Sequence, residues 1–259
     1  MILDDILKAR QEQLMREKAL VPLDKMKAEA KAKKDLPPDF EKALSGDSLS
    51  FICEVKRASP SKGMIAQSFH PIETACKYER CGATAISCLT EEHYFKGSNA
   101  YLKEIAEAVN IPVLRKDFIT DSYQIYHARV LGAASVLLIA AVLNQNELSE
   151  LLSITHDLGI SALVEVHNEQ ELEKALRSNA RIIGVNNRDL KTFNVSLDTT
   201  KRLFVSIPSD KIKVSESGIK TNEDAKMLKS FGADAVLIGE TLMRSNDIKQ
   251  TFLKLSEGV

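Results

Sequence analysis

The sequence predicts an α/β fold: a closed (β/α)8 TIM barrel with an N-terminal helical extension. Three observations predict this fold. Short aliphatic segments alternate with segments of helical spacing, eight such units follow one another, and no break interrupts them. The repeat occupies residues 49–259, whereas residues 1–48 do not fit it. We therefore expect a single catalytic barrel domain with a helical extension packed on it.

The extension begins with a predicted amphipathic helix, because its apolar residues recur at helical spacing. These are Ile2, Leu3, Ile6, Leu7 and Leu14. A stretch rich in Lys and Ala follows at residues 25–34 and ends before Pro37 and Pro38. We interpret its basic residues as a solvated helix face and expect the first helix to cap the barrel.

Eight short apolar segments are the predicted strands. Their aliphatic composition is typical of parallel strands that are buried on both faces. In chain order they are residues 51–56, 84–89, 112–116, 135–140, 162–166, 181–186, 211–216 and 235–239.

Helical spacing fills the segments between the strands, most plainly at residues 168–178 and 221–231, and a last helix is expected near residues 247–255. Three helices open with N-capping pairs: Asn144 with Glu147, Asn168 with Glu171, and Thr221 with Asp224. Glycines follow helix ends at Gly82, Gly132, Gly159 and Gly232. The rival fold is an open doubly wound sheet, but the first turn has no GxGxxG and no Walker A pattern occurs, which favours the barrel.

Composition limits the classes of function. The chain has 35 basic and 36 acidic residues, and this balance argues against nucleic-acid binding. The longest apolar stretch, residues 133–143, is about half the length of a membrane span. Asp4 and Asp5 stand where a signal peptide would carry bases. The four cysteines form no CxxC pair, so we expect reduced thiols and a cytoplasmic protein.

Polar residues close several of the predicted strands, where this fold carries its reactive groups. The candidate catalytic residues are Glu54, Lys56, Lys116, Glu165, Asn186 and Glu216. A structural ion-pair network inside the barrel is the alternative interpretation. Five charges and one amide at five strand ends favour an active site over that alternative, because unpaired charges are costly to bury.

The turns after the last two strands predict a phosphate site. Ser217-Gly218 follows the seventh strand, and Gly239-Glu240 follows the eighth. Barrels often bind phosphate at this point through backbone N–H groups at a helix start. A simple strand-to-helix turn is the other explanation for Gly239.

Metal binding is not expected. The five histidines show no HxH or HExxH spacing, and His93 in the loop after the second strand is expected to be a surface residue. His167-Asn168-Glu169 matches H-x-E, but the P-C-x-x-C partner of zinc deaminases is absent.

From these residues alone, the sequence predicts a phosphate-handling lyase or isomerase. Lys116 would also suit a Schiff-base aldolase, since a desolvated lysine attacks carbonyls. A sugar-phosphate isomerase and a catalytically silent phosphate-binding barrel remain open as well.

At these same positions the sequence resembles the indole-3-glycerol phosphate synthase family. The matching segments span nearly the whole barrel in order, and the helical extension also fits the family. They are EVKRASPS at 54–61, LTEEHYFKGS at 89–98, LRKDFI at 114–119, LVEV at 163–166, GVNNRDL at 184–190, VSESGI at 214–219 and LIG at 237–239.

The resemblance implies a carboxy-lyase of tryptophan biosynthesis. It would convert 1-(2-carboxyphenylamino)-1-deoxyribulose 5-phosphate to indole-3-glycerol phosphate, CO2 and water. It implies no cofactor, and its partner would be this small sugar phosphate. We expect a monomer or a weak homo-oligomer.

The resemblance also implies roles for the polar residues. Lys116 would protonate the substrate carbonyl, with Lys56 as an alternative acid. Glu165 would take part in the dehydration, and Glu54 would orient the lysines. Asn186 and Glu216 would hold the substrate hydroxyls and the charge network.

The remaining implied roles concern binding. Arg188, together with Lys56, would face the substrate carboxylate. Pro60, Phe95, Phe118 and Leu137 would enclose the aromatic ring, and Ser59 and Leu237 belong to the same substrate-binding set. Ser217, Gly218, Gly239 and Glu240 would hold the phosphate, Glu240 through its backbone N–H with its side chain turned outward.

Overall fold

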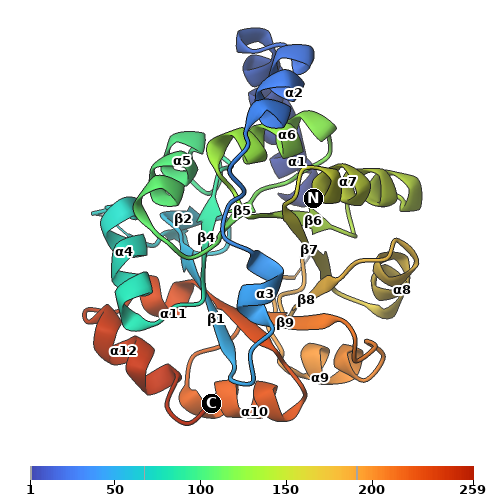
Figure 1. Cartoon of the computed structure of the whole chain (residues 1–259). Helices are drawn as coiled ribbons and strands as arrows, with labels where there is room; N and C mark the ends of the chain where they lie inside the picture. Colours follow the sequence, from blue (N-terminus) through green and yellow to red (C-terminus); the bar gives the residue numbers. More distant parts are fainter. Residues whose placement is uncertain (1, 67, 191) are drawn as a thin grey trace.

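The computed structural model describes residues 2–66, 68–190 and 192–259. Eight parallel strands close into a barrel in the order β1-β10-β9-β8-β7-β6-β5-β4, as Figure 1 shows. They are β1 Ser50–Val55, β4 Ala85–Leu89, β5 Val113–Lys116, β6 Ser135–Ile139, β7 Ser161–Val166, β8 Ile182–Asn186, β9 Ile212–Glu216 and β10 Ala235–Ile238. The predicted closed barrel is confirmed, and each predicted strand boundary agrees with the structure to within one residue.

Helices alternate with the strands and cover the outside of the barrel (Figure 1). They are α4 Pro71–Cys81, α5 Asn99–Ala108, α6 Ser122–Leu131, α7 Gln145–Asp157, α8 Glu169–Arg177, α9 Asp198–Phe204, α10 Asn222–Ser230 and α12 Ile248–Leu255. A short helix, α11 Glu240–Met243, lies between β10 and α12 and was not predicted. None of the described helices is long and apolar enough to cross a membrane.

The predicted helix ends have the expected local chemistry. Asn144 and Thr221 both form complete capping boxes at the starts of α7 and α10. Asn168 caps α8 by accepting the Glu171 N–H, but the Glu171 carboxylate accepts from the N–H of His167 rather than of Asn168. All four helix-terminal glycines have positive φ, between 69° and 102°, as left-handed C-terminal residues require.

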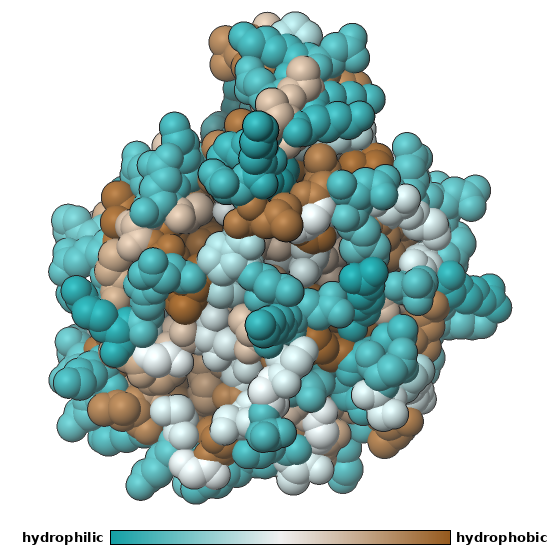
Figure 2. Space-filling model, in the orientation of Figure 1, coloured by the Kyte–Doolittle hydropathy of each residue, from teal (hydrophilic) through white to brown (hydrophobic). Residues whose placement is uncertain are grey.

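The extension comprises three helices: α1 Ile2–Leu20, α2 Leu23–Ala32 and α3 Phe40–Leu44. Helix α2 projects beyond the barrel (Figure 1), and hydrophilic side chains cover much of its visible surface (Figure 2). Its apolar residues Met26 and Ala30 are buried against Tyr123 and Tyr126 of α6, which leaves Lys25 exposed. The basic residues of α2 therefore lie on a solvated face, as predicted.

The unpredicted helix α3 closes the N-terminal end of the barrel. Phe40 and Leu44 are fully buried, and they pack against inward-facing residues of the strands such as Ile52 and Leu163. This end is filled by apolar side chains, and the charged inward-facing residues Glu54, Lys116, Glu165 and Glu216 lie at the opposite, C-terminal end.

A two-stranded hairpin interrupts the first βα connection. It consists of β2 Ala58–Ser59 paired antiparallel with β3 Gly63–Met64. Gly63 has a φ of 63°, which glycine adopts at little cost in a tight turn. The hairpin holds the segment 59–62 over the C-terminal end of the barrel, where this segment lines the cavity.

Candidate active site

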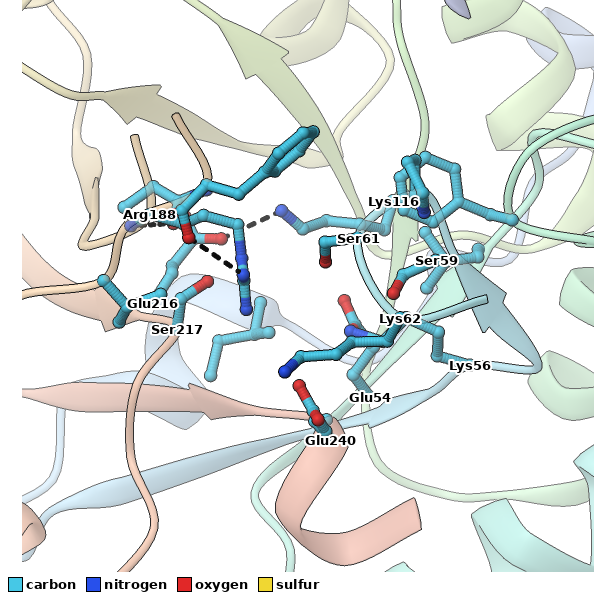
Figure 3. Close-up of a pocket in the computed structure, with 18 of the residues that line it drawn as sticks. Glu54, Lys56, Ser59, Ser61, Lys62, Lys116, Arg188, Glu216, Ser217 and Glu240 are labelled. Atoms are coloured by element: carbon cyan, nitrogen blue, oxygen red, sulfur yellow. Dashed lines mark hydrogen bonds and ion pairs between the residues drawn. The ribbon is translucent and has the colours of Figure 1, made fainter. Parts of the chain in front are cut away.

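A cavity of about 510 Å³ lies at the C-terminal ends of the barrel strands. Every residue predicted from the sequence as catalytic, substrate-binding or phosphate-binding lines this cavity. Figure 3 shows the labelled charged side chains converging on it from several strands and from the β2–β3 hairpin. The sequence therefore located the wall of the site; the roles of its residues stay predictions.

Lys116 is at the centre of the charge cluster. Its Nζ lies 2.9 Å from Glu165 Oε2 of β7 and 2.9 Å from Glu216 Oε2 of β9. Both carboxylates are nearly fully buried, with side chains 3% and 1% exposed. On β1 and just beyond it, Lys56 Nζ forms an ion pair with Glu54 Oε1. The two lysines thus bind different carboxylates at the same rim.

Burial and charge act against each other on this cluster. Burial alone would lower the pKa of Lys116, but Glu165, Glu216 and Glu54 outweigh it and raise that pKa above its ordinary value. Burial raises the pKa of Glu216, and repulsion from Glu165 adds to the effect. The pKa of Glu165 is lowered instead, because Lys116 and His167 outweigh its burial. These effects favour the ammonium form of Lys116 and the ionised form of Glu165.

Two glycines make room for these carboxylates. A Cβ atom on Gly184 of β8 would collide with Glu216 Oε1, and one on Gly239 would collide with Glu54 Oε1. Gly239 was predicted as a close approach for phosphate. In the structure a side chain at Gly239 would also crowd the Glu54–Lys56 ion pair, since its Cβ atom would lie only 3.1 Å from Lys56 Nζ.

Apolar side chains form another part of the wall. The rings of Phe95 and Phe118 have centroids 5.9 Å apart and are tilted by 39°. Buried carboxylates fix both backbones: the Phe95 N–H donates to Glu91 Oε2 at 2.9 Å and the Phe118 N–H to Asp117 Oδ1 at 2.8 Å. The two aromatic rings are consequently held by hydrogen bonds as well as by packing.

The predicted phosphate residues come from neighbouring strands, because β9 pairs with β10. Ser217 and Gly218 have φ values of 68° and 88°, which make a tight left-handed turn after β9. Gly239 precedes α11, and Glu240 opens it. The carboxylate of Glu240 accepts a hydrogen bond from Arg244 Nε at 3.1 Å, so its charge is partly neutralised within the chain.

Sequence reasoning missed several lining residues. Lys62 and Arg244 add positive charge to the cavity, and Ile2, Leu3 and Ile6 place helix α1 over it. The apolar stripe of α1 was recognised, but nothing in its spacing indicates that it covers the site rather than the side of the barrel.

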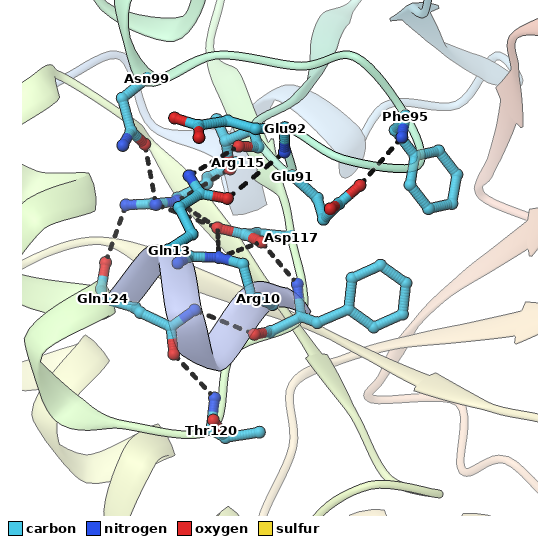
Figure 4. A network of polar contacts seen from close by, with 12 residues as sticks. Arg10, Gln13, Glu91, Glu92, Phe95, Asn99, Arg115, Asp117, Thr120 and Gln124 are labelled. Carbon is cyan, nitrogen blue, oxygen red and sulfur yellow. Dashed lines mark hydrogen bonds and ion pairs between the residues drawn. The ribbon is translucent and has the colours of Figure 1, made fainter. Parts of the chain in front are cut away.

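A buried polar network fixes α1 to β5 (Figure 4). Arg10 Nε lies 2.8 Å from Asp117 Oδ1, and Arg115 Nη2 lies 2.9 Å from Asp117 Oδ2. Sequence reasoning assigned no role to Arg115 and Asp117, the two neighbours of Lys116 in the chain. Arg115 is fully buried and donates hydrogen bonds to Gln124 and Asn99 outside the barrel. Lys116, the next residue along β5, faces the cavity instead.

His167 also belongs to the environment of the cluster. Its Nε2 lies 3.4 Å from Glu165 Oε1, and its Nδ1 lies 3.0 Å from Glu171 Oε2. Sequence reasoning had considered this histidine only as part of an H-x-E match. Within residues 2–66, 68–190 and 192–259, no group of three or more His, Cys, Asp or Glu residues is arranged to hold a metal ion.

The fold and site together define a (β/α)8-barrel protein with a lysine–carboxylate cluster, an apolar wall and glycine turns suited to a phosphate. A family model described as indole-3-glycerol phosphate synthase matches residues 3–255. The chain belongs to this family.

Curated relatives agree with this assignment, and a solved structure shares the fold. The chain is 48% identical to an indole-3-glycerol phosphate synthase of Alkaliphilus metalliredigens, over 100% of this chain and 99% of the relative. It is 51% identical to the enzyme of that name from Endomicrobium trichonymphae, over 99% and 100%. Thiamine phosphate pyrophosphorylase from Pyrococcus furiosus superposes with a TM-score of 0.62 at 14% identity, covering 84% of this chain and 96% of that structure. The last likeness shows the fold alone.

Proposed function

We propose that the chain catalyses the decarboxylating and dehydrating ring closure of 1-(2-carboxyphenylamino)-1-deoxyribulose 5-phosphate to indole-3-glycerol phosphate. It would thereby act as a carboxy-lyase in tryptophan biosynthesis, in keeping with its family. The observation that carries the proposal is the Lys116 ammonium, 2.9 Å from both Glu165 and Glu216 in the cavity. A cationic lysine beside two carboxylates supports a reaction that needs both a proton donor and a proton acceptor.

The proposed substrate has groups that suit each part of the cavity. Its phosphate fits the turns at Ser217-Gly218 and Gly239-Glu240, with Lys62 nearby as a counter-charge. Its aromatic ring fits against the apolar wall that contains Phe95 and Phe118, and Pro60, Ser59, Leu137 and Leu237 complete that wall. The substrate carboxylate would face Arg188 and Lys56, which are cationic lining residues.

In the first step Lys116 donates a proton to the substrate carbonyl oxygen while the ring carbon that bears the carboxylate attacks the carbonyl carbon. The carboxylate then leaves as CO2, and its bonding electron pair restores the aromatic ring. Glu216 and Asn186 would hold the substrate hydroxyls, and Glu54 would orient Lys56 through their ion pair.

In the second step the new hydroxyl takes up a proton and leaves as water. A proton is lost from the neighbouring carbon, which creates the indole double bond. Glu165 is suited to accept this proton, since it stays ionised beside Lys116. Lys116 or Lys56 would supply the proton for water. Two protons are donated and one is removed, so each turnover takes up one proton.

The charge state of Lys116 argues against the aldolase alternative. A Schiff base requires a neutral amine, and the neighbouring carboxylates raise the pKa of Lys116 instead of lowering it. Borohydride treatment in the presence of substrate is therefore expected to trap no adduct.

We also propose that the working unit is a monomer or a weak homo-oligomer, since one chain supplies all the cavity-lining residues described above. Residues 1–48 would serve as an extension of the barrel domain at 49–259, because α1 lines the cavity. The four cysteines are free thiols, in keeping with a cytoplasmic location. Light scattering after gel filtration tests the first of these proposals.

The direct test follows formation of the indole chromophore from the carboxyphenylamino substrate, with and without a chelator. We expect turnover that the chelator does not change, and Lys116→Met should lower kcat by about 10²–10⁴-fold or more. Substrate binding without turnover would identify a silent phosphate-binding barrel. Wild-type turnover by Lys116→Met would discard the mechanism.

A further inference from the structure

The loop after β7 places a histidine between two carboxylates. His167 Nδ1 lies 3.0 Å from Glu171 Oε2 of α8, and Nε2 lies 3.4 Å from Glu165 Oε1 of β7. A neutral imidazole has one protonated nitrogen and one bare nitrogen, so one carboxylate would face a lone pair. Only the imidazolium form offers an N–H group to both. Burial lowers the pKa of His167, but the two carboxylates outweigh burial and raise it to about 10.

Glu171 holds this histidine in place from the side away from the cavity. Its Oε2 also accepts the backbone N–H of His167 at 2.8 Å, and its Oε1 accepts from Asn168 Nδ2 at 2.7 Å. Asn168 in turn accepts the Glu171 N–H, which ties the loop to the first turn of α8. The His167 side chain is only 12% exposed. The ring thus has little freedom to turn away from Glu165.

Glu165 is consequently bracketed by two cations, one on each carboxylate oxygen. Lys116 donates a hydrogen bond to Oε2 at 2.9 Å, whereas His167 Nε2 lies at an ion-pair distance of 3.4 Å from Oε1 without hydrogen-bond geometry. Glu216 shares Lys116, but its other oxygen, Oε1, is buried without a hydrogen-bond partner. Of these two carboxylates, only Glu165 has His167 as a second cationic neighbour, whereas Glu216 faces repulsion from Glu165 and Glu54.

We propose that His167 is a positioning residue that selects Glu165, rather than Glu216, as the ionised base of the cluster. It does so as a fixed imidazolium ion supported by Glu171. This inference rests on the proposed function, because it assigns the base of that reaction. The charged groups involved are Glu165 of β7 and Glu171 of α8 at the ring itself, with Lys116, Glu216 and Glu54 beyond Glu165.

The kinetic test uses His167→Gln, which keeps a hydrogen-bond donor and removes the charge. We expect kcat to fall by about tenfold or more while KM changes by less than about twofold. The acidic limb of the kcat–pH profile should move upward by about one unit, since Glu165 loses one of its two cations. A slower enzyme whose acidic limb has not moved would overturn the proposal, because a merely structural role predicts that result.

Two further variants control this test. Glu171→Gln should also move the acidic limb of the kcat–pH profile upward, but by less than His167→Gln. If His167→Gln fails to fold, Glu171→Gln takes its place in the test. His156→Asn removes another partly buried histidine, beside Arg181 near the end of α7, which does not line the cavity. It should leave kcat and its pH profile unchanged.

NMR titration tests the proposal without substrate. Both ring nitrogens of His167 should be protonated at pH 8, whereas burial lowers the pKa of His156, which should then be neutral. Labelled carboxyl carbons should show Glu216 taking up its proton before Glu165 in the wild type, and His167→Gln should narrow that difference. A neutral His167 ring at pH 8 would refute the proposal. An inactive wild type with these titrations intact would refute only the proposed function.

Discussion

A methyl group on Gly184 should disturb the catalytic cluster without disturbing the barrel. A Cβ atom there would lie well under 3.0 Å from Glu216 Oε1, closer than real Cβ contacts come. It would lie 3.3 Å from the Glu216 carboxyl carbon. Leu163 Cδ1 would lie 3.1 Å away, which a small shift relieves. Reaching ordinary contact requires the Glu216 carboxylate to retreat by about 1 Å.

That retreat breaks the 2.9 Å contact between Glu216 and Lys116. A misplacement of about 1 Å at a reacting group costs about 100-fold in rate, so Gly184→Ala should lower kcat by about that factor. The obstructing atom ends a flexible side chain, so the melting temperature should fall by only a few degrees, about 1 kcal/mol for a chain of this size.

Steady-state assays of indole formation and thermal unfolding measure both quantities. Gly46→Ala is the matched control, since a Cβ atom there meets nothing within 4 Å. The reasoning fails if Gly184→Ala turns over at the wild-type rate, or if the control is slowed equally.

Three other substitutions give distinct signatures. Glu165→Gln should lower kcat by about 10²–10⁴-fold with little change in KM, and normal turnover would reassign the base. Gly239→Ala should displace the Glu54 carboxylate from Lys56, so kcat should fall; a rise in KM alone would mean that only phosphate binding was touched. Arg10→Met should lower the free energy of unfolding at pH 7 by about 3 kcal/mol in urea titrations, because it removes one of the two arginines paired with buried Asp117. Arg10 and Arg115 outweigh burial and lower the pKa of Asp117, so this stabilisation is present above the ordinary carboxyl pKa and is lost as the pH falls below it. An equal loss at pH 7 and pH 3 would contradict this account.

The barrel could be predicted because its signal is repeated. Each strand is a short aliphatic run and several helices open with a side-chain cap, so many imperfect observations support one architecture. The missed helices α3 and α11 have five and four residues, and each strand of the missed β2–β3 hairpin has two. Runs of that length contain too few residues to show a period.

The cavity-facing residues could be predicted for a similar reason. Side chains alternate along a strand, so Glu54 and Lys56 must share a face, and Lys116 must point away from Arg115. The period alone does not say which of the two faces of β5 is the inside. Lys116 is inside because the ladder pairs it with Leu89 of β4, at the rim of the barrel, and this register is a property of the closed sheet.

The residues that sequence reasoning missed are those whose partners lie far along the chain. Arg10 stands on the apolar stripe of α1, four residues after Ile6 and four before Leu14, and a charge in that position must find a buried counter-ion. The stripe therefore indicates that Arg10 requires a buried counter-ion. It does not identify that counter-ion, because Asp117 is 107 positions away. His167 differs, since both of its carboxylates lie within four residues of it. The H-x-E match pairs His167 with Glu169, but the capping turn of α8 brings Glu171 to the ring instead. The Asn168–Glu171 cap was recognised in the sequence, so it contained the information needed to identify the partner of His167.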